Sequence, residues 1–379
     1  MRPLILLLCA ASGFAQIGRS YVSNTTEDLR GVSTVSRQVA WASGTHGTYL
    51  RTTDGGLTWI PAQVPDAATV DFRAVVAFSA DEAFLMSAGP GDQSRIYHTA
   101  DAGQHWQRQL TAAHAKSFFD SMVFWDSKHG IVLGDPIPDD SGKLKFEVLM
   151  TDDGQTWHAV SSSALPEAVA GEGAFAASNS CLALVPQAIP ASSTLDPNLW
   201  FATGGKVARV FHSSDRGQTW HVVDTPIIHG PESAGIFSIA FRDPMHGVIA
   251  GGDFQHPDDD GPNLAFTSDG GATWTLATMH PLAYFSSVAY DRHFIQKAIA
   301  LQDEQKKKEA AGEKIRVKPI DPQRLFIVGT DFVFDSRPPN NPRRIDGVKK
   351  PRMKFNAASA FPEGGALIVG PKGSIAYIQ

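Results

Sequence analysis

Eight charged residues of the 379-residue chain have types and positions that suit ligand recognition. Four are arginines and four carry carboxylates, and each stands at the edge of a short apolar run that we predict to be a strand. They are Arg30, Arg73, Arg95, Arg209, Asp120, Asp135, Glu172 and Asp253. Arginine binds carboxylates through two parallel hydrogen bonds, and a pair of carboxyl groups can act as acid and base. If these side chains meet at one opening, we expect a ligand site there.

Three interpretations of this set remain open. The charges could form a ring of ion pairs that stiffens the rim of a channel. They could instead bind a carboxylate-bearing or polyhydroxylated ligand, or they could catalyse a reaction. A glycosidase would need two of Asp120, Asp135, Glu172 and Asp253 at a separation of about 5 to 10 Å.

An eight-residue pattern, repeated five times, determines where these residues lie. It places Ser or Thr first, Asp third, Gly fifth and Trp eighth, although the copy that begins at Met150 lacks the leading hydroxyl. The Asp carboxylate can accept backbone N–H groups of its own turn, and Gly adopts a φ angle that other residues resist. Each copy therefore predicts a stapled turn followed by a Trp ring to bury. The Asp and Trp residues of the pattern are Asp54, Trp59, Asp101, Trp106, Asp152, Trp157, Asp215, Trp220, Asp269 and Trp274.

The spacing of the repeats predicts the fold. Successive tryptophans of the pattern are 47, 51, 63 and 54 residues apart, as expected for one four-stranded sheet per repeat. A first strand that pairs with the last blade would remove the open sheet edges. We therefore predict an all-β fold, a single seven-bladed propeller over residues 16–379. The predicted blades are 29–60, 72–109, 118–160, 172–223, 235–277, 284–335 with insertions at 293–322 and 336–354, and 355–379 together with 20–23.

The five repeats resemble the Asp-box, or BNR, repeat of β-propellers such as bacterial sialidases, sortilin, xyloglucan hydrolases and photosystem II assembly factors. Longer stretches, such as AGPGDQSRIYHT at 88–99 and GIFSIAFRDPMHG at 235–247, resemble exported bacterial propellers related to photosystem II stability and assembly factors. The resemblance implies that the box is structural and joins the third and fourth strands of a blade. The eight charged residues would then gather at the opposite mouth of the channel.

Enzyme signatures are sparse in the sequence. The Arg-Ile-Pro segment of sialidases is absent, and serine hydrolase, Rossmann and P-loop motifs are absent as well. The histidines show no metal-ligand spacing. The acidic pair at 139–140 and the acidic triplet at 258–260 are compatible with a Ca²⁺ loop or with ordinary solvated turns. We predict no metal and no cofactor.

The N-terminal residues 1–15 resemble a secretory signal, with Arg2, an apolar run and small residues before Gln16. Cleavage near Ala15 would remove Cys9 and leave Cys181 as the only cysteine, which would exclude an internal disulfide. The net charge is −6, yet residues 292–354 contain 16 Lys and Arg against 8 Asp and Glu. This excess marks either a basic patch for an anionic partner or two solvated insertions.

These patterns together predict an exported, periplasmic or extracellular scaffold that is monomeric and non-catalytic. Its partner would be a protein or a glycan at the channel mouth. No nucleic-acid module is present, and the apolar runs are too short to span a membrane. The alternative is a glycoside hydrolase, sialidase-like or other, or a lyase that uses the carboxylates at the mouth.

Overall fold

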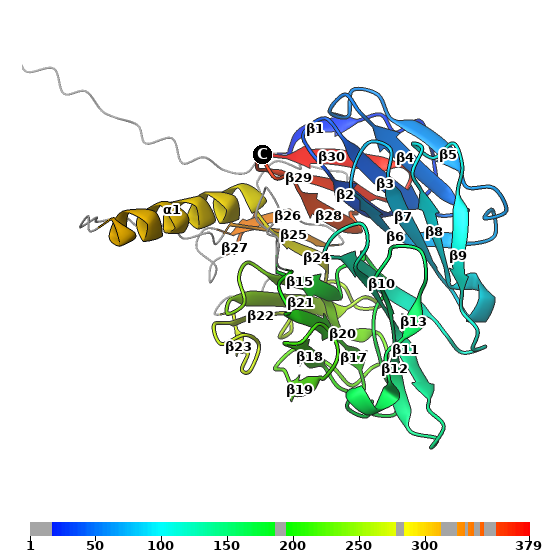
Figure 1. The fold of residues 1–379 in the computed structure, drawn as a ribbon, viewed down its shortest axis with the longest axis vertical. Helices are drawn as coiled ribbons and strands as arrows, with labels where there is room; N and C mark the ends of the chain where they lie inside the picture. The colour runs from blue at the N-terminus through cyan, green and yellow to red at the C-terminus, as the bar shows by residue number, and fades with distance from the viewer. Residues whose placement is uncertain are drawn as a thin grey trace, which may run out of the picture.

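A computed structural model describes residues 17–185, 195–277, 284–311, 324–329, 333–336, 342–344 and 354–379. Its described strands form seven antiparallel sheets (Figure 1). Each sheet has one inner strand that contacts the inner strands of both neighbouring sheets, and the inner strand of the last sheet, β28 (Ala357–Ala360), contacts that of the first, β2 (Leu29–Thr34). The sheets are therefore arranged as a propeller around a central axis.

Six of the sheets have four strands each. The first contains β2 (Leu29–Thr34), β3 (Ala40–Gly44), β4 (Thr48–Thr52) and β5 (Ile60–Gln63). The second contains β6 (Asp71–Ala77), β7 (Ala83–Ala88), β8 (Arg95–Thr99) and β9 (Gln107–Thr111). The third contains β10 (Phe119–Phe124), β11 (Gly130–Pro138), β12 (Leu144–Thr151) and β13 (His158–Ala159). The fourth contains β15 (Leu182–Leu184), β16 (Leu199–Ala202), β18 (Arg209–Ser213) and β19 (His221–Asp224). The other two contain β24 (Phe285–Tyr290), β25 (Leu325–Gly329), β26 (Val333–Ser336) and β27 (Pro342–Arg344), and β1 (Ile17–Tyr21), β30 (Ser374–Ile378), β29 (Ala366–Gly370) and β28 (Ala357–Ala360).

The remaining sheet is a composite of six strands, and because of it the prediction of a seven-bladed propeller is wrong. It contains β14 (Glu172–Gly173), β17 (Gly204–Gly205), β20 (Ala234–Phe241), β21 (Gly247–Asp253), β22 (Leu264–Thr267) and β23 (Thr275–Leu276). Within this sheet β14 pairs with β17, and β17 pairs with β20. The number of regular four-stranded blades is therefore six, and Glu172 does not begin the inner strand of its blade as predicted.

The way in which the ring closes also differs from the prediction. The N-terminal strand is Ile17–Tyr21, not 20–23, and it pairs antiparallel with β30 at the top of Figure 1. This pairing completes one sheet only. Among the described strands, no ladder joins one four-stranded sheet to the next. Side-chain packing and isolated hydrogen bonds hold neighbouring sheets together, so a hydrogen-bonded ladder does not close the ring.

The repeated turns have the local chemistry that their residues predict. In the first copy, the Asp54 carboxylate accepts the backbone N–H of Thr58 at 2.9 Å, and the Thr52 hydroxyl accepts that of Gly56 at 2.9 Å. Gly56 has a φ of 83°, which favours glycine over other residues. The Trp59 ring that follows is 1% exposed. The turn is thus a staple that carries its ring into the core.

The third copy of the pattern along the chain uses different residues from those predicted. There the Thr151 hydroxyl, not Met150, begins the turn and accepts the N–H of Gly154 at 2.9 Å. Asp153, not Asp152, accepts the backbone N–H of Thr156 at 2.7 Å. The turn is one residue shorter than in the other copies. Its leading hydroxyl is therefore that of Thr151, so this copy does not lack one.

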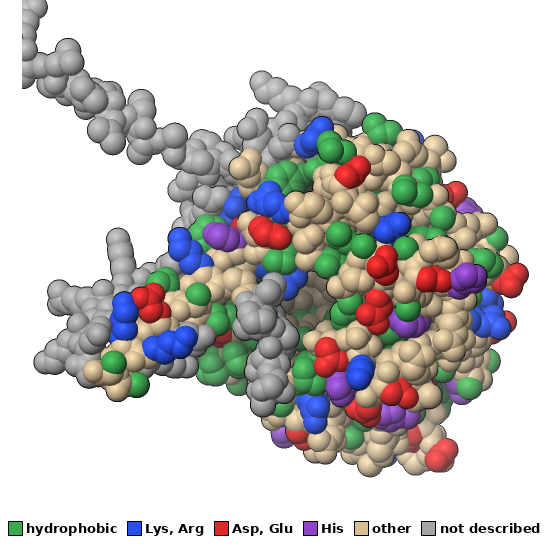
Figure 2. Space-filling model, turned by 45° about the horizontal axis from the view of Figure 1, so that its top comes forward, with side chains coloured by type: hydrophobic (Ala, Val, Ile, Leu, Met, Phe, Trp, Pro, Cys, Tyr) green, Lys and Arg blue, Asp and Glu red, His purple; other side chains and the backbone are tan. Residues whose placement is uncertain are grey.

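The first insertion of the sixth predicted blade forms a helix, α1 (Arg292–Ala310), which projects from the body in Figure 1. Asp291 caps it by accepting the N–H of His293 at 3.1 Å, and Ile295 packs its side chain into the core. Lys and Arg side chains appear along the helix in Figure 2. The second insertion, predicted as a loop over 336–354, contains strand β27, and most of its other residues lie outside the described ones.

Candidate functional site at the channel mouth

Irregular pairing near the start of the inner strands creates the site. In five of these strands the register shifts by one residue against the second strand, which leaves one residue of the inner strand unpaired. The unpaired residues are Arg30, Arg73, Asp120, Phe237 and Ser286. A sixth shift, between β11 and β12, leaves Asp135 unpaired. Because a bulge redirects the side chain of its extra residue, these six can turn toward the axis.

All six bulge residues line one cavity of about 440 Å³. Every sheet contributes to its wall from the start of its inner strand or from the segment just before it. The remaining lining residues are mostly aromatic or small, with one lysine: Phe118, Ala174, Phe175, Ala176, Ala177, Phe254, Tyr284, Lys354, Phe355 and Asn356. This cavity, which we call the mouth cavity, therefore lies at the propeller axis.

Two arginines give the mouth cavity its positive charge. Arg73 donates from Nη1 to the carbonyl oxygen of Ala176 at 3.0 Å. The Nε atoms of Arg73 and Arg30 are both buried and have no hydrogen-bond partner. Burial, followed by the neighbouring charge of Arg30, lowers the pKa of Arg73 to about 10, so it remains charged at neutral pH. Both guanidinium groups thus keep donors for an incoming acceptor.

Two carboxyl groups also line the mouth cavity, and the inner strand of Asp120 contacts that of Arg73. Burial raises the pKa of Asp135 to about 6, against the effect of the Ala174 N–H, which donates to Asp135 Oδ1 at 2.9 Å. Asp120 is 0% exposed, and neither of its carboxyl oxygens has a partner. Burial and the nearby Asp135 raise the pKa of Asp120 well above its usual range. Burial therefore favours the protonated form of Asp120 more than in an exposed aspartate, against the effect of the Arg73 charge.

A glycine allows the close approach that holds Asp135. A Cβ atom on Gly173 would lie 2.8 Å from Asp135 Oδ1, closer than a carbon and an oxygen can pack. The backbone after Gly173 can therefore reach the carboxylate and donate the Ala174 N–H. The aromatic side of the wall is equally compact, with the Phe175 and Phe237 rings stacked at 3.8 Å between centroids.

Two of the predicted site residues are paired with each other outside the mouth cavity. The Glu172 carboxylate accepts from Arg209 Nε at 2.9 Å and from the Thr203 hydroxyl at 2.7 Å. The Glu172 side chain is fully buried, and that of Arg209 is 12% exposed. Neither residue lines the cavity. The prediction that they face the common opening is wrong, because β14 draws Glu172 into the composite sheet.

Arg95 and Asp253 also lie away from the cavity lining. Arg95 donates from Nε to the carbonyl oxygen of Asp92 at 2.5 Å, within its own loop. Asp253 accepts the N–H of Gln255 at 2.9 Å and pairs with His256 at 3.0 Å. Of the eight predicted residues, the structure thus brings four together: Arg30, Arg73, Asp120 and Asp135.

Sequence reasoning missed the aromatic residues of the wall. Phe237 and Ser286 occupy the same bulge position as Arg30 and Arg73, and an alignment of the inner strands alone would have placed them there. Tyr284 is half-buried, and burial raises its pKa above the usual range for a tyrosine. No charge or motif marks this residue in the sequence, because its position depends on the strand that follows it.

Two searches of the described residues bear on cofactors and membranes. In that part of the chain, no group of three or more His, Cys, Asp or Glu side chains is placed to hold a metal ion. The acidic loop at Asp139 uses its carboxylate within its own turn, where it accepts the Ser141 N–H at 2.9 Å. No helix within the described ranges is both long and apolar enough to cross a bilayer.

The fold and the mouth cavity define the chain as an all-β propeller with a cavity at its axis. A family model described as "Photosynthesis system II assembly factor YCF48" matches residues 19–115. The photosystem II stability/assembly factor HCF136 of Arabidopsis thaliana is 37% identical over 68 residues, and the protein of the same name from Oryza sativa subsp. japonica is equally similar. These matches span 17% of this chain and 16% and 15% of the two relatives.

Solved structures share the fold over nearly the whole chain. YCF48 bound to a D1 peptide has a TM-score of 0.56 at 16% identity, and the alignment covers 95% of each chain. The GH74 xyloglucanase of Xanthomonas campestris has a TM-score of 0.59 at 15% identity, over 94% of this chain and 53% of the xyloglucanase. The protein is therefore a propeller similar to the photosystem II assembly factors of the YCF48 type.

Proposed function

We propose that this protein is a non-catalytic scaffold that binds a peptide segment of a partner protein in the mouth cavity. One observation carries the proposal: Arg30 and Arg73 present buried, unpartnered Nε donors in a cavity that six aromatic side chains also line. Carboxylates of a peptide would bind the guanidinium groups, and its apolar side chains would pack on the rings. The similarity to YCF48, whose structure holds a D1 peptide, supports a peptide as the ligand.

The test is a binding titration with two fluorescently labelled peptides, the D1 peptide of the YCF48 complex and a scrambled version of it. We expect saturable binding by the wild type and a loss of affinity of about tenfold or more in Arg73→Ala, the effect of one charge-assisted hydrogen bond. Arg108→Ala, at an exposed position on β9, is the matched control and should bind as the wild type does. Equal binding by Arg73→Ala and the wild type would contradict the proposal.

A second candidate function, acid-catalysed cleavage of a glycoside, rests on the raised pKa values of Asp135 and Asp120. A pair of carboxyl groups with a raised pKa is what such a mechanism needs. It ranks second because Asp120 is 0% exposed, which leaves Asp135 alone at the cavity surface. Hydrolysis of fluorogenic glycosides by the wild type but not by Asp135→Asn would favour it over the scaffold.

Membership in the Asp-box repeat group and export from the cytoplasm are part of the same proposal. The turn chemistry of Asp54, Asp101, Asp215 and Asp269 supports the first. The second rests on residues 1–15, which lie outside the described residues. Sequencing the N-terminus of the protein recovered from its host would test export, with a mature chain that begins at Gln16 as the expected result.

A further inference from the structure

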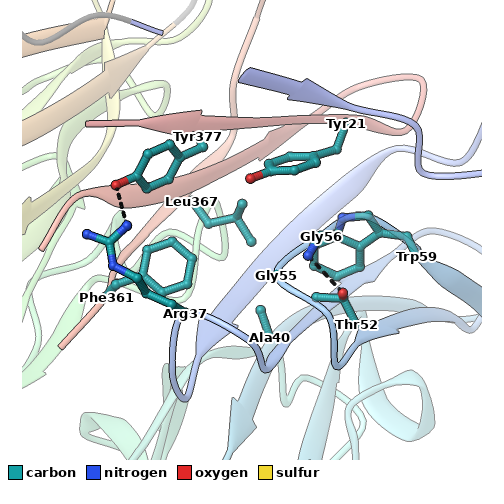
Figure 3. Close-up of a pocket in the computed structure, with 10 residues that line it drawn as sticks. All are labelled: Tyr21, Arg37, Ala40, Thr52, Gly55, Gly56, Trp59, Phe361, Leu367 and Tyr377. Carbon is teal, nitrogen blue, oxygen red and sulfur yellow. Dashed lines mark hydrogen bonds between the residues drawn. The ribbon is translucent and has the colours of Figure 1, made fainter. Parts of the chain in front are cut away.

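A second pocket of about 110 Å³ lies at the seam between the sheet of β1 and β28–β30 and the sheet of β2–β5. It shares no lining residue with the mouth cavity. Figure 3 shows Tyr377 and Arg37 at one end, the Trp59 ring and its turn at the other, and Leu367 between them. We call it the seam pocket.

The seam pocket lies where a stapled turn meets the sheet before it. At other seams a side chain of the preceding sheet donates to the stapled turn of the next. The Tyr49 hydroxyl donates to the carbonyl oxygen of Gly103 at 2.9 Å, and Trp200 Nε1 donates to that of Gly270 at 2.8 Å. At this seam the Tyr21 ring lies against Gly56, and Asn24, just after β1, donates from Nδ2 to the carbonyl oxygen of Trp59 at 3.0 Å.

Polar groups at the two ends of the seam pocket are left with unused donors. The Trp59 indole is 1% exposed, and its buried Nε1 has no partner, as is also true of Trp106 and Trp274, whereas Trp220 Nε1 donates to the carbonyl oxygen of Gly217 at 3.0 Å. Arg37 is exposed and donates to the Tyr377 hydroxyl at 3.0 Å and to two backbone carbonyls. A guanidinium group has about five N–H donors, so part of its capacity is free for an anion.

Three exposed apolar residues are sequence neighbours of residues that line the seam pocket. Val22, Leu57 and Ile60 are 75%, 65% and 57% exposed, and each is the direct neighbour of a lining residue. They are half of the six large apolar side chains that are exposed within the described ranges. Exposed apolar side chains of this kind are available for contact with a partner protein.

We propose that the seam pocket is a second docking site, which binds an extended segment of a partner protein with an apolar residue next to an Asp or Glu. The apolar side chain fills the pocket against Trp59 and Tyr21, and the carboxylate binds the free donors of Arg37. A backbone carbonyl of the segment gives Trp59 Nε1 its acceptor. The site is separate from the mouth cavity and does not depend on the function proposed for it.

The test follows the indole N–H resonances of ¹⁵N-labelled protein, which has eight tryptophans. Trp59→Phe assigns the reporter signal. The probe is the capped tetrapeptide Gly-Leu-Glu-Gly, with Gly-Leu-Gln-Gly and Gly-Ser-Glu-Gly as controls. We expect the Trp59 resonance to shift on titration, with affinity for each control lower by about tenfold, the worth of one charge-assisted bond or one buried side chain.

Two variants test the location of the site. Ala40→Leu fills the pocket and Arg37→Gln removes its charge, and each should abolish or weaken the shift of the Trp59 resonance. Arg37→Gln changes an exposed residue, so it serves if Ala40→Leu does not fold. Arg73→Ala, in the mouth cavity, should leave the shift unchanged, which separates this site from the proposed function.

Three outcomes would overturn the proposal. The first is a Trp59 resonance that none of the peptides moves at millimolar concentration. The second is a shift that persists undiminished in both Ala40→Leu and Arg37→Gln. The third is a shift that appears when protein alone is concentrated, because the occupant would then be a second copy of this chain.

Discussion

Arg209 and Glu172 form a buried ion pair that joins the composite sheet to the sheet before it. The Arg209 Nε to Glu172 Oε1 distance is 2.9 Å, and the carboxylate also accepts the Val169 N–H at 2.8 Å. Two residues that carry opposite charges at distant positions in the sequence thus satisfy each other. They are part of the scaffold and leave the neighbouring mouth cavity to Arg30 and Arg73.

Breaking this pair should destabilise the fold. Arg209→Ala leaves the fully buried Glu172 carboxylate without its cation, and we expect the free energy of unfolding to fall by about 3 to 5 kcal/mol. The exposed pair of Lys143 and Glu167, 3.1 Å apart, is the control, and Lys143→Ala should cost less than about 1 kcal/mol. Urea unfolding of both variants measures the difference. Similar losses in the two would show that burial of the pair has no special weight.

Asp135 should make stability depend on pH between about 4 and 6. Its pKa is about 6 in the fold, above the value near 3.9 of an unfolded chain, so the folded state holds more protons in this range. Its contribution to stability is therefore present below about pH 4 and is lost as pH rises through 6. Asp135→Asn should flatten this part of the curve of unfolding free energy against pH. An unchanged slope in the variant would assign the effect elsewhere.

The stapled turns should give the opposite dependence at lower pH. The Thr273 hydroxyl, followed by the Thr273 N–H, lowers the pKa of Asp269 to about 2. The stability that this carboxylate contributes is present above about pH 4 and is lost as pH falls through 2. Asp269→Asn should reduce the pH dependence of thermal unfolding between these values. Asp81→Asn, an exposed residue outside the turns, should leave the dependence as in the wild type.

The seam pocket gives a matched pair of tryptophan substitutions. Trp200 and Trp59 are 0% and 1% exposed, but only the first of these two donates from its indole nitrogen, to the carbonyl oxygen of Gly270. Replacement by Phe removes a similar volume at both positions. We expect Trp200→Phe to cost about 1 to 3 kcal/mol more than Trp59→Phe, because it leaves a buried carbonyl unpaired. Equal losses by chemical denaturation would mean that the bond to Gly270 adds nothing.

The sequence predicted the local structure well because each stapled turn is made within eight residues. Asp54 and Thr52 find their hydrogen-bond partners within a few positions of themselves, so residue type alone dictates the bonds. The exception, Asp153 in place of Asp152, arises where two adjacent carboxylates compete for one role. The positions of Arg30, Arg73, Asp120 and Asp135 near strand ends were also readable from the repeats.

The sequence by itself therefore determined the all-β class, the turns and the candidate charges at the strand ends. The tertiary structure alone decided which charges share a cavity, because that depends on bulges and on strand pairing between residues far apart in the chain. The pairing of β14 with Gly205 removed Glu172 and Arg209 from the mouth, and the contact of β28 with β2 closed the ring by packing. The repeat pattern predicts neither the β14 pairing nor the contact of β28 with β2, because each forms between blades and not within one.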